Sequence, residues 1–534
     1  MSRKTALATA FITVVLCSSL VGAQLVNLAA ANIMPFPTPQ QAFTIRSDGS
    51  VDPPTASIQR NGEIYTLTDD ITEYTIVIER DNVTLDGGGY TLQGTGNSTG
   101  VFVNNRRGIT VRNMEIRNYF YGIRLLTDLY ARESTGNHTL SGNNIADNNY
   151  GIYLGHTSNN VLRNNQMNDN TVSLSIIYSS LGDDIASFTH DIDTSNTVNG
   201  KPVHYWVNQQ NKAVPPDAGY IGLINCTNML VQNLDLTGDS QAVLLVSTTY
   251  STITKNAITN NSEQGIYLYK SSNNSISENS LANNAVSGIY LYHSSNNIIS
   301  ENTITENNQD GIYLFNSSHN SMNGNTVTLN NEGIHVYSRG TNNSIVGNTI
   351  TENNGYGISL EWVHNNFVSE NYIVENGGGI LVSASSNNRI IGNTVKENNG
   401  WGIRLEGRDQ RNNVIYHNYF IDNNVEAGFQ VSIPGLFFGL DDWRPGNPNV
   451  WNNGTVGNYW SDYLTRYTNA TEIEGTGVGD TPFYINPNNI DNYPVMKQHI
   501  IPEFPTWTPM LLTLIILAIA IAHYKRRLPK TRKR

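Results

Sequence analysis

Two adjacent carboxylates, Asp183 and Asp184, have the residue type and spacing that suit acid–base chemistry on sugars. Enzymes that cleave glycosidic bonds place two carboxyl groups beside the bond, one as the acid and the other as the base or nucleophile. Asp191 and Asp193 follow shortly after, in the same acidic stretch. These residues support one hypothesis, a polysaccharide lyase or hydrolase that uses Asp183 and Asp184.

A bound metal ion is a second kind of chemistry to consider. Copper sites use clustered His, Met or Cys side chains, and the histidines of this chain are scattered, with no HxH or MxxM motif. Only His190 and His204, which flank an acidic stretch, form a pair that could act together. Calcium could be held by acidic residues near the C-terminal end, namely Asp441, Asp442, Asp462 and Asp480. We therefore expect no cofactor, with calcium as the alternative and copper disfavoured.

Aromatic residues recur at a regular interval in the middle of the chain. One set is Tyr267, Tyr290 and Tyr313, and a second set is Tyr269, Tyr292, Phe315 and Tyr337. Sugar rings stack on aromatic rings, and exposed aromatic patches often mark binding sites. Stacked aromatic pairs also stabilise neighbouring strands without any ligand. Both interpretations stay open at this point, and the first predicts a glycan-binding surface formed by these seven residues.

A repeat must position these side chains. Glycine followed by isoleucine recurs at Gly265, Gly288, Gly311, Gly333, Gly357, Gly379 and Gly402. Successive glycines are 22 to 24 residues apart, a period typical of solenoid proteins.

One repeat, residues 265–287, indicates how each coil folds. Ile266, Leu268, Ile276 and Leu281 are its aliphatic residues, and the runs around them alternate apolar and polar at the strand period of two. No apolar run at helical spacing is long enough for a helix. We predict three short strands and three turns per coil, with each strand pairing with its copy about 23 residues later. The predicted fold is all-β, a parallel β-helix.

Asparagines are expected to close the turns. Asn273, Asn274, Asn279, Asn283 and Asn284 lie between the predicted strands, and Asn tolerates the left-handed backbone conformation better than other non-glycine residues. Amides stacked in register can also bond from one coil to the next. The copies expected in one such ladder are Asn302, Asn325, Asn348, Asn371, Asn393 and Asn418.

Composition narrows the range of partners. The formal net charge is -12, so the chain should repel nucleic acid. The two cysteines allow no disulfide framework and no CxxC metal knuckle. A chain of 534 residues can still form one elongated body, because a solenoid lengthens without a thicker core.

Both ends of the chain carry targeting features. Residues 1–31 have the basic start, apolar run and small residues of a secretory signal peptide. Residues 507–524 are largely apolar, and the basic tail at 525–534 fits the positive-inside rule. We predict a single C-terminal transmembrane helix that leaves the β-helix outside the membrane.

The regularity of the repeat, and the places where it breaks, predict the parts of the chain between these two ends. The predicted parts are a linker or entry segment at 32–57, an N-terminal cap and first coils at 58–180, an irregular excursion at 181–219, regular coils at 220–427, and a C-terminal cap at 428–500. Irregular excursions on repeat proteins often carry function. The aromatic residues expected to seal the open core in the C-terminal cap are Trp443, Trp451, Tyr459, Trp460 and Tyr463.

The repeat NNxIxxNxIxxN with GIxL resembles the NosD-type periplasmic copper-binding β-helix family. The resemblance covers roughly residues 58–496, and its most specific parts are IQRNGEIYTL, DTSNTVNGKPVHYWVNQQN and VGNYWSDY. It implies a right-handed coil and a cell-surface location of the kind found among archaeal surface proteins. None of the NTD, GHG or RIK signatures of pectin-hydrolysing relatives is present.

Pro502, Glu503 and Phe504, within residues 501–506, resemble the PEF-type sorting signal handled by archaeosortases. That resemblance implies cleavage near the motif and transfer of the protein to a lipid anchor.

We therefore expect a non-catalytic cell-surface protein that binds glycans or surface-layer components and is held at the membrane by its C-terminus. A polysaccharide lyase or hydrolase is the alternative. A copper-site accessory role, as the family resemblance implies, ranks third.

Overall fold

The computed structural model describes residues 41–128, 135–177, 185–238, 240–407, 410–424, 430–433 and 448–497. The chain divides into two compact units, which meet between Ser187 and Phe188 in the sequence. The predicted signal peptide, the PEF-like motif, the transmembrane segment and the basic tail lie outside the described residues. Within those residues, no helix has the length and apolar character needed to cross a membrane.

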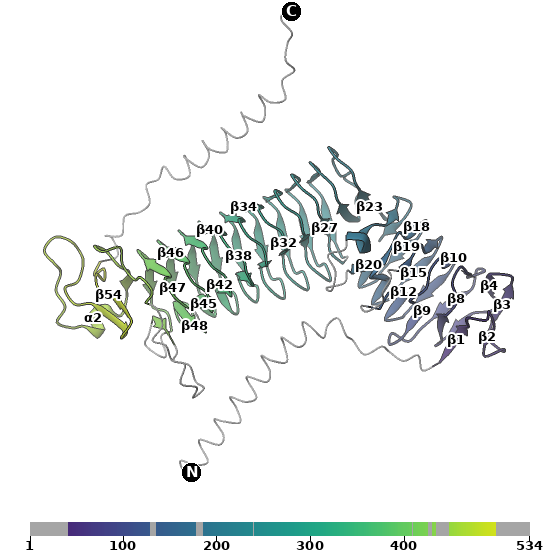
Figure 1. Ribbon diagram of the computed structural model, residues 1–534, viewed down its shortest axis with the longest axis horizontal. Helices are drawn as coiled ribbons and strands as arrows, with labels where there is room; N and C mark the ends of the chain where they lie inside the picture. Colours follow the sequence, from purple (N-terminus) through teal and green to yellow (C-terminus); the bar gives the residue numbers. More distant parts are fainter. Residues whose placement is uncertain are drawn as a thin grey trace, which may run out of the picture. The chain divides into compact units, whose positions relative to one another are not determined.

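The first unit is a stack of coils, each with three short parallel strands (Figure 1). The first sheet contains β1 (Ala42–Ile45), β6 (Thr75–Ile78), β9 (Thr99–Asn104), β12 (Tyr121–Leu126), β16 (Tyr150–Gly155) and β20 (Val172–Ile177). The second contains β4 (Ile64–Leu67), β7 (Thr84–Asp86), β10 (Thr110–Arg112), β14 (Thr139–Ser141) and β18 (Val161–Arg163). The third contains β5 (Ile71–Thr72), β8 (Thr91–Gln93), β11 (Glu115–Arg117), β15 (Asn144–Ala146) and β19 (Gln166–Asn168). At the N-terminal end, β2 (Val51–Asp52) and β3 (Ile58–Asn61) add antiparallel strands.

The second unit repeats the same three-sheet plan over more coils (Figure 1). Its first sheet contains β23 (Lys201–Val207), β24 (Tyr220–Ile224), β27 (Val243–Val246), β30 (Ile266–Tyr269), β33 (Ile289–Tyr292), β36 (Ile312–Phe315), β39 (Ile334–Tyr337), β42 (Tyr356–Glu361), β45 (Gly378–Ser383), β48 (Ile403–Glu406) and β51 (Val431–Ser432). The second sheet contains β25 (Leu230–Gln232), β28 (Thr252–Thr254), β31 (Ser275–Ser277), β34 (Ile298–Ser300), β37 (Ser321–Asn323), β40 (Ser344–Val346), β43 (Phe367–Ser369), β46 (Arg389–Ile391) and β49 (Val414–Tyr416). The third contains β26 (Asp235–Thr237), β29 (Ala257–Thr259), β32 (Ser280–Ala282), β35 (Thr303–Thr305), β38 (Thr326–Thr328), β41 (Thr349–Thr351), β44 (Tyr372–Val374), β47 (Thr394–Lys396), β50 (Tyr419–Ile421) and β52 (Tyr459–Trp460).

The pairing register confirms the predicted coil. Strand β30 pairs in parallel with β33, and Tyr267 is the partner of Tyr290, its copy in the next repeat. The aliphatic residues expected inside, Ile266, Leu268, Ile276 and Leu281, are fully buried.

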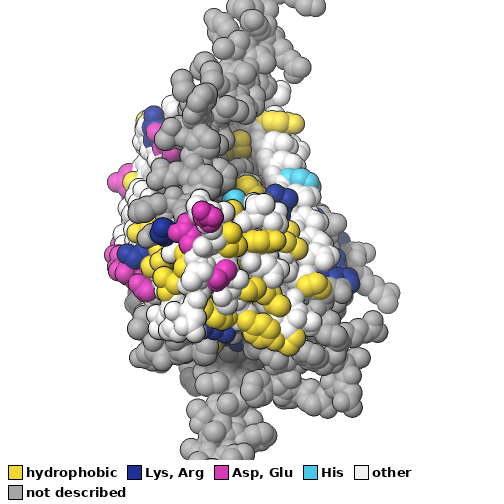
Figure 2. Space-filling model, turned by 90° about the vertical axis from the view of Figure 1, so that its left-hand side faces the viewer, with side chains coloured by type: hydrophobic (Ala, Val, Ile, Leu, Met, Phe, Trp, Pro, Cys, Tyr) yellow, Lys and Arg dark blue, Asp and Glu magenta, His cyan; other side chains and the backbone are white. Residues whose placement is uncertain are grey.

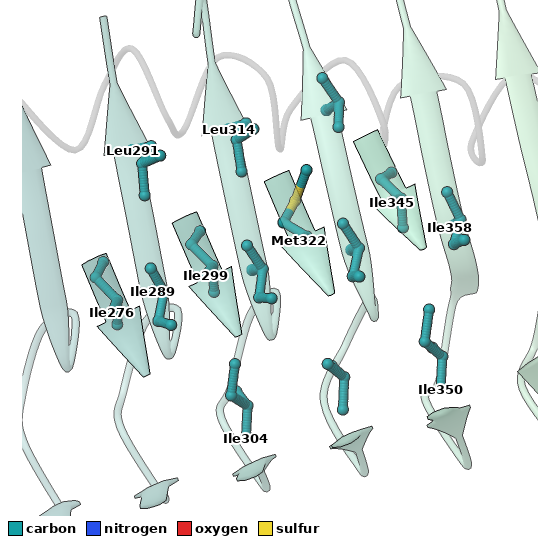
Figure 3. Close-up of a cluster of buried hydrophobic side chains, with 14 of the residues drawn as sticks. Ile276, Ile289, Leu291, Ile299, Ile304, Leu314, Met322, Ile345, Ile350 and Ile358 are labelled. Carbon is teal, nitrogen blue, oxygen red and sulfur yellow. The ribbon is translucent and has the colours of Figure 1, made fainter. Parts of the chain in front are cut away.

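Aliphatic side chains of successive coils stack directly on one another inside the second unit (Figure 3). Ile276 pairs with Ile299, Ile299 with Met322, and Met322 with Ile345. Each fully buried side chain of this size contributes about 1.5–3 kcal/mol. Because every coil lends its faces to both neighbours, stability accumulates along the stack.

Buried asparagines form the predicted ladders between coils. Asn279 donates from its backbone N–H and from Nδ2 to Oδ1 of Asn302, both at 3.0 Å, and Nδ2 also donates to the Ile253 carbonyl of the preceding coil at 2.9 Å. The same pattern continues through all six expected copies and ends on Asn458. One asparagine therefore satisfies polar groups in three successive coils.

The left-handed conformation falls on the residue before each ladder asparagine. Asn273 (φ 60°), Glu278 (φ 56°) and Asn283 (φ 56°) turn the chain, whereas Asn274, Asn279 and Asn284 point inward and are buried. The sequence suggested that asparagine both turns the chain and forms the ladder. In the structure, these two roles fall on neighbouring residues. A glutamate can take the turn position because its side chain stays outside.

The segment predicted as an irregular excursion contains a regular strand. Strand β23 pairs in parallel with β24, with Val203 opposite Tyr220, so Lys201–Val207 belongs to the first sheet. The short strand β22 (Thr197–Val198) pairs with it in an antiparallel hairpin.

Aromatic side chains cover the C-terminal end of the core. Trp460 stacks between Phe420 and Phe483, with ring centroids 4.7 and 4.4 Å away, and Trp451 and Tyr463 are also fully buried. The indole N–H of Trp460 donates to Asp491 Oδ2. Trp443, Asp441 and Asp442 of the predicted cap lie outside the described residues. Figure 2 shows hydrophobic side chains gathered on this end. Large hydrophobic residues that are exposed in this part of the sequence include Val450, Leu464, Ile473 and Tyr484.

Candidate functional site

The outward face of the first sheet in the second unit carries the predicted aromatic columns. Alternate residues of a strand point to opposite faces, so Tyr290 and Tyr292 face outward while Ile289 and Leu291 fill the core. The pairing register places Tyr267, Tyr290, Tyr313 and then His335 in one column. The second column runs through Tyr269, Tyr292, Phe315, Tyr337 and then Glu361. Both columns therefore change residue type in adjacent coils. A histidine follows the tyrosines of the first column, and a glutamate follows the aromatic residues of the second.

The rings of these columns stack on one another. The centroid of Tyr290 lies 5.1 Å from Tyr267 and 4.9 Å from Tyr313, with interplanar angles below 20°. Tyr292 and Phe315 are 5.0 Å apart and nearly parallel. Because the flat ring faces contact each other, a ligand approaching from outside meets mainly ring edges and hydroxyl groups.

The first members of both columns are buried. Tyr267 is 8% exposed and Tyr269 is 2% exposed, and the ring of Phe188 lies 5.5 Å from that of Tyr269. Tyr290, Tyr292, Tyr313, Phe315 and Tyr337 remain partly exposed. The binding role of the seven residues stays a prediction, and these five are the ones that a ligand can reach.

A histidine surrounded by three carboxylates lies where the columns change. His335 Nδ1 is 3.4 Å from Asp310 Oδ2 and 3.6 Å from Glu332 Oε2, and His335 Nε2 is 3.4 Å from Glu361 Oε1. We call these four residues the His335 cluster. Asp310 and Glu332 each directly precede the glycine that begins a repeat, so the turn before the strand delivers both carboxylates to the same face.

Burial and charge shift the protonation of the His335 cluster. Burial alone would lower the pKa of His335, but its interactions with Asp310, Glu361 and Glu332 outweigh that effect and raise the pKa well above 6.5. Burial is also the main cause that raises the pKa of Glu332. Glu332 Oε2 and His335 Nε2 are buried and lack a well-formed hydrogen bond to any described residue. The cluster thus contains two groups with raised pKa values, and it has buried polar atoms that form no hydrogen bond.

The same face continues past the His335 cluster with a polar and aromatic group. Arg404 lies in the column of His335, two coils beyond Ser359. Its guanidinium is 4.8 Å from the centre of the Trp401 ring and 2.6 Å from Glu406 Oε2. Between His335 and Arg404 the column passes through Ser359 and Leu381, which are buried. The Arg404 group therefore lies on the same sheet face but is separated from the His335 cluster.

Trp362 directly follows Glu361 and was not singled out from the sequence. Its side chain is 60% exposed, and its backbone is left-handed, with φ 57°. The equivalent turn position holds Lys270, His293, Asn316 and Ser338 in preceding coils. A bulky residue at positive φ is uncommon and costly, so an exposed indole here is unusual for reasons of folding alone.

The other predicted site residues are placed apart from this face or fall outside the structure. Asp183 and Asp184 lie outside the described residues. His204 pairs in register with the core residue Ile221 and points inward, whereas the His190 ring lies beside that of Tyr205, which occupies the opposite face of the strand. The two histidines are therefore not brought together as a metal pair.

The described residues do not present a copper site of the expected composition. Within the described ranges, the residues grouped closely enough to share a metal ion are Asp310, Glu332 and His335. Copper sites draw on several His, Met or Cys ligands, and this group supplies one imidazole and carboxylates.

Fold and repeat together define a right-handed parallel β-helix protein. The description "Right handed beta helix region" matches residues 76–199 and 214–350, and "Periplasmic copper-binding protein (NosD)" matches residues 341–465. Both matches agree with the β-helix fold described above, and the second agrees with the NosD-type resemblance that the sequence implied. No curated protein matches it.

Several solved structures match this chain at low similarity. The enzymatically active domain of tailspike protein 2 from bacteriophage CBA120 is 11% identical at a TM-score of 0.34, over 44% of this chain and 45% of that chain. The periplasmic alginate epimerase AlgG is 14% identical at a TM-score of 0.24, over 71% of this chain and 80% of its own. The A-module of the Azotobacter vinelandii mannuronan C-5 epimerase AlgE6 is 11% identical at a TM-score of 0.25, over 70% and 89%. The chain spans less than half of the tailspike domain.

Proposed function

We propose that the protein is a non-catalytic cell-surface β-helix that binds a glycan along the first-sheet face of its second unit. The observation that carries this proposal is the line of partly exposed aromatic, acidic and hydroxyl side chains in the column from Tyr292 to Glu406. The neighbouring column from Tyr290 to Arg404 adds to it but is interrupted by the buried residues Ser359 and Leu381. At about 4.8 Å per coil, this line suits an extended polymer better than a compact small molecule.

Trp362 supplies the flat apolar surface that the tyrosine columns lack. The ring faces of Tyr290 and Tyr313 are occupied by each other, whereas the Trp362 side chain is mostly open to solvent. Exposed aromatic residues are frequent anchors of binding. We therefore assign sugar stacking to Trp362, and hydrogen bonding to the tyrosine hydroxyls and the carboxylates of the His335 cluster.

A location outside the cytoplasm supports this function. The predicted signal peptide, the apolar segment at 507–524 and the sorting motif around Glu503 are all typical of an exported, membrane-held protein, and the matching NosD family is described as periplasmic. Surface-layer components are neighbours that such a protein would meet, and the membrane would hold it through the C-terminal helix or a lipid.

A glycan array with matched variants tests the proposal. Trp362→Ala should weaken binding by at least about tenfold, because an anchoring tryptophan commonly contributes about 2 kcal/mol or more. Tyr290→Ala combined with Tyr292→Ala should also abolish binding. Tyr250→Ala is the control, since Tyr250 is equally exposed (63%) and left-handed but lies several coils away. Equal loss in the control would contradict a site at Trp362.

A polysaccharide lyase or hydrolase is the second candidate, and the His335 cluster is the observation that favours it. A histidine and a glutamate with raised pKa beside further carboxylates are groups able to exchange protons with a sugar. Shortened polysaccharide products that disappear in His335→Gln would establish this function. Asp184→Ala tests the acidic pair that the sequence suggested.

A further inference from the structure

We propose that Asp310, Glu332 and His335 bind a divalent transition-metal ion, with Glu361 holding the imidazole in position. This site is separate from the copper role that the family description names, and it does not depend on glycan binding. Its ligands come from the turn before β36, the turn before β39 and β39 itself.

The distances fit one ion with three protein ligands. Zinc lies about 2.0–2.2 Å from nitrogen and oxygen ligands in a tetrahedral site, so its ligands are about 3.4 Å from one another. His335 Nδ1 is 3.4 Å from Asp310 Oδ2 and 3.6 Å from Glu332 Oε2. The three ligand atoms all lie within 4.8 Å of each other. Only small side-chain rotations are needed to close the site around an ion.

The two nitrogens of His335 have different partners, which assigns their roles. Nδ1 faces Asp310 and Glu332, so it is the metal ligand, whereas Nε2 lies 3.4 Å from Glu361 Oε1. Metal-binding histidines usually donate their second N–H to a carboxylate, which fixes the ring and its tautomer. Glu361 is in ion-pair contact with Nε2 and has no formed hydrogen bond to it, and we assign it the role of a positioning residue.

The excess of carboxylates in the His335 cluster favours the binding of a cation. Three carboxylates surround one imidazole, and Glu332 Oε2 is buried without a hydrogen-bond partner among the described residues. A buried carboxylate oxygen that has an ion-pair contact but no hydrogen bond is costly inside a protein.

The ligand types select among metals. One imidazole nitrogen with two carboxylates suits Zn²⁺ or Mn²⁺, whereas Ca²⁺ takes six to eight oxygen ligands. Because the ligands come from two coils and Glu361 comes from a third, an ion here ties successive coils together. Binding to the folded state alone also stabilises that state.

Metal binding should compete with protons. The titratable groups that face His335 from its own and neighbouring coils are Asp310, Tyr313, Glu332, Tyr337 and Glu361. Because the ligands must lose their protons, affinity should rise with pH and binding should release protons.

Calorimetry on the chelator-treated full-length protein tests the proposal. We expect one Zn²⁺ or Mn²⁺ per chain, weaker binding of Ca²⁺, and proton release that differs between buffers. Glu332→Gln and Asp310→Asn, which keep the side-chain shape, should weaken binding at least about 100-fold, and Glu361→Gln about 10- to 100-fold.

Glu301→Gln is the matched control, because Glu301 is an exposed glutamate on a turn of the same unit. It should leave both affinity and stoichiometry unchanged. Circular dichroism of each variant checks that the coil has folded, and two independent ligand substitutions guard against failure of one to fold. Several weak ions per chain that persist in the ligand variants would overturn the proposal, as would no binding of Zn²⁺ or Mn²⁺.

Discussion

The imidazole of His335 takes the next position in the ring column directly after Tyr313, with the two ring centroids 5.0 Å apart. The rings of the column therefore remain in contact at the coil where tyrosine is replaced by histidine. The aromatic column that stabilises the sheet thus also positions His335 in the candidate site.

Asn325→Ala should destabilise the second unit substantially. The change removes the acceptor for the Asn302 N–H and Nδ2 groups and the donor to the Ile299 carbonyl, all buried. Each buried group left without a partner costs about 1–3 kcal/mol. Urea denaturation followed by circular dichroism measures the loss. Asn323→Ala, at a partly exposed position whose side chain donates to the Ser321 hydroxyl, should shift stability by no more than about 0.5 kcal/mol.

Trp362→Asn should make the protein more stable and weaken glycan binding. Asparagine accepts the left-handed conformation that costs other residues about 1–2 kcal/mol, and φ at Trp362 is 57°. Thermal melts and a binding assay on the same samples check both effects. Tyr250→Asn, at φ 55°, should give a similar gain in stability with binding intact. If neither substitution raises the melting temperature, the left-handed turn imposes no strain at these sites.

Glu263→Gln should change how stability depends on pH. Burial raises the pKa of Glu263 from 4.5 to about 7, so the wild type loses the contribution of this group as pH rises through that range. Glutamine does not titrate, and it keeps an oxygen to accept from Gln241. The variant should therefore gain stability relative to wild type between pH 5 and pH 8. Denaturation at both values tests this, and a difference that does not vary with pH would contradict it.

Trp460→Ala should open the C-terminal end of the core. The indole is 1% exposed, stacks on Phe420 and Phe483, and donates to Asp491. Truncating a buried tryptophan costs about 3–5 kcal/mol. Limited proteolysis should then begin at the C-terminal coils, whereas cleavage that starts in the first unit would show that the cap does not protect this end.

The fold of the coil could be predicted because the sequence features that determine it recur in every repeat. The 22-to-24-residue spacing of the Gly-Ile pairs, the four buried aliphatics and the ladder through Asn302 recur in successive copies, and the strand pairing follows from that register. The separation of turn and ladder roles was harder to see. Glu278 takes the left-handed position in one copy where Asn273 and Asn283 serve at the other turns, so residue type alone does not mark it.

The candidate site was missed because it consists of departures from the repeat. Asp310, Glu332 and Glu361 lie in different copies, and only the parallel register brings them to one histidine. The available signal was the replacement of a tyrosine by His335 and of an aromatic residue by Glu361 in otherwise regular columns. Comparing each copy with its neighbours, position by position, would have located both.

A glycan-array and polysaccharide-degradation screen on wild type, Trp362→Ala and Tyr250→Ala tests the central claim most directly. We predict saturable binding to a glycan by wild type and Tyr250→Ala, binding weaker by at least about tenfold in Trp362→Ala, and unchanged polymer length in every sample. Shortened products would contradict the non-catalytic function and identify the His335 cluster as an active site. Binding by Trp362→Ala with the same affinity as wild type would contradict the location of the site on this face.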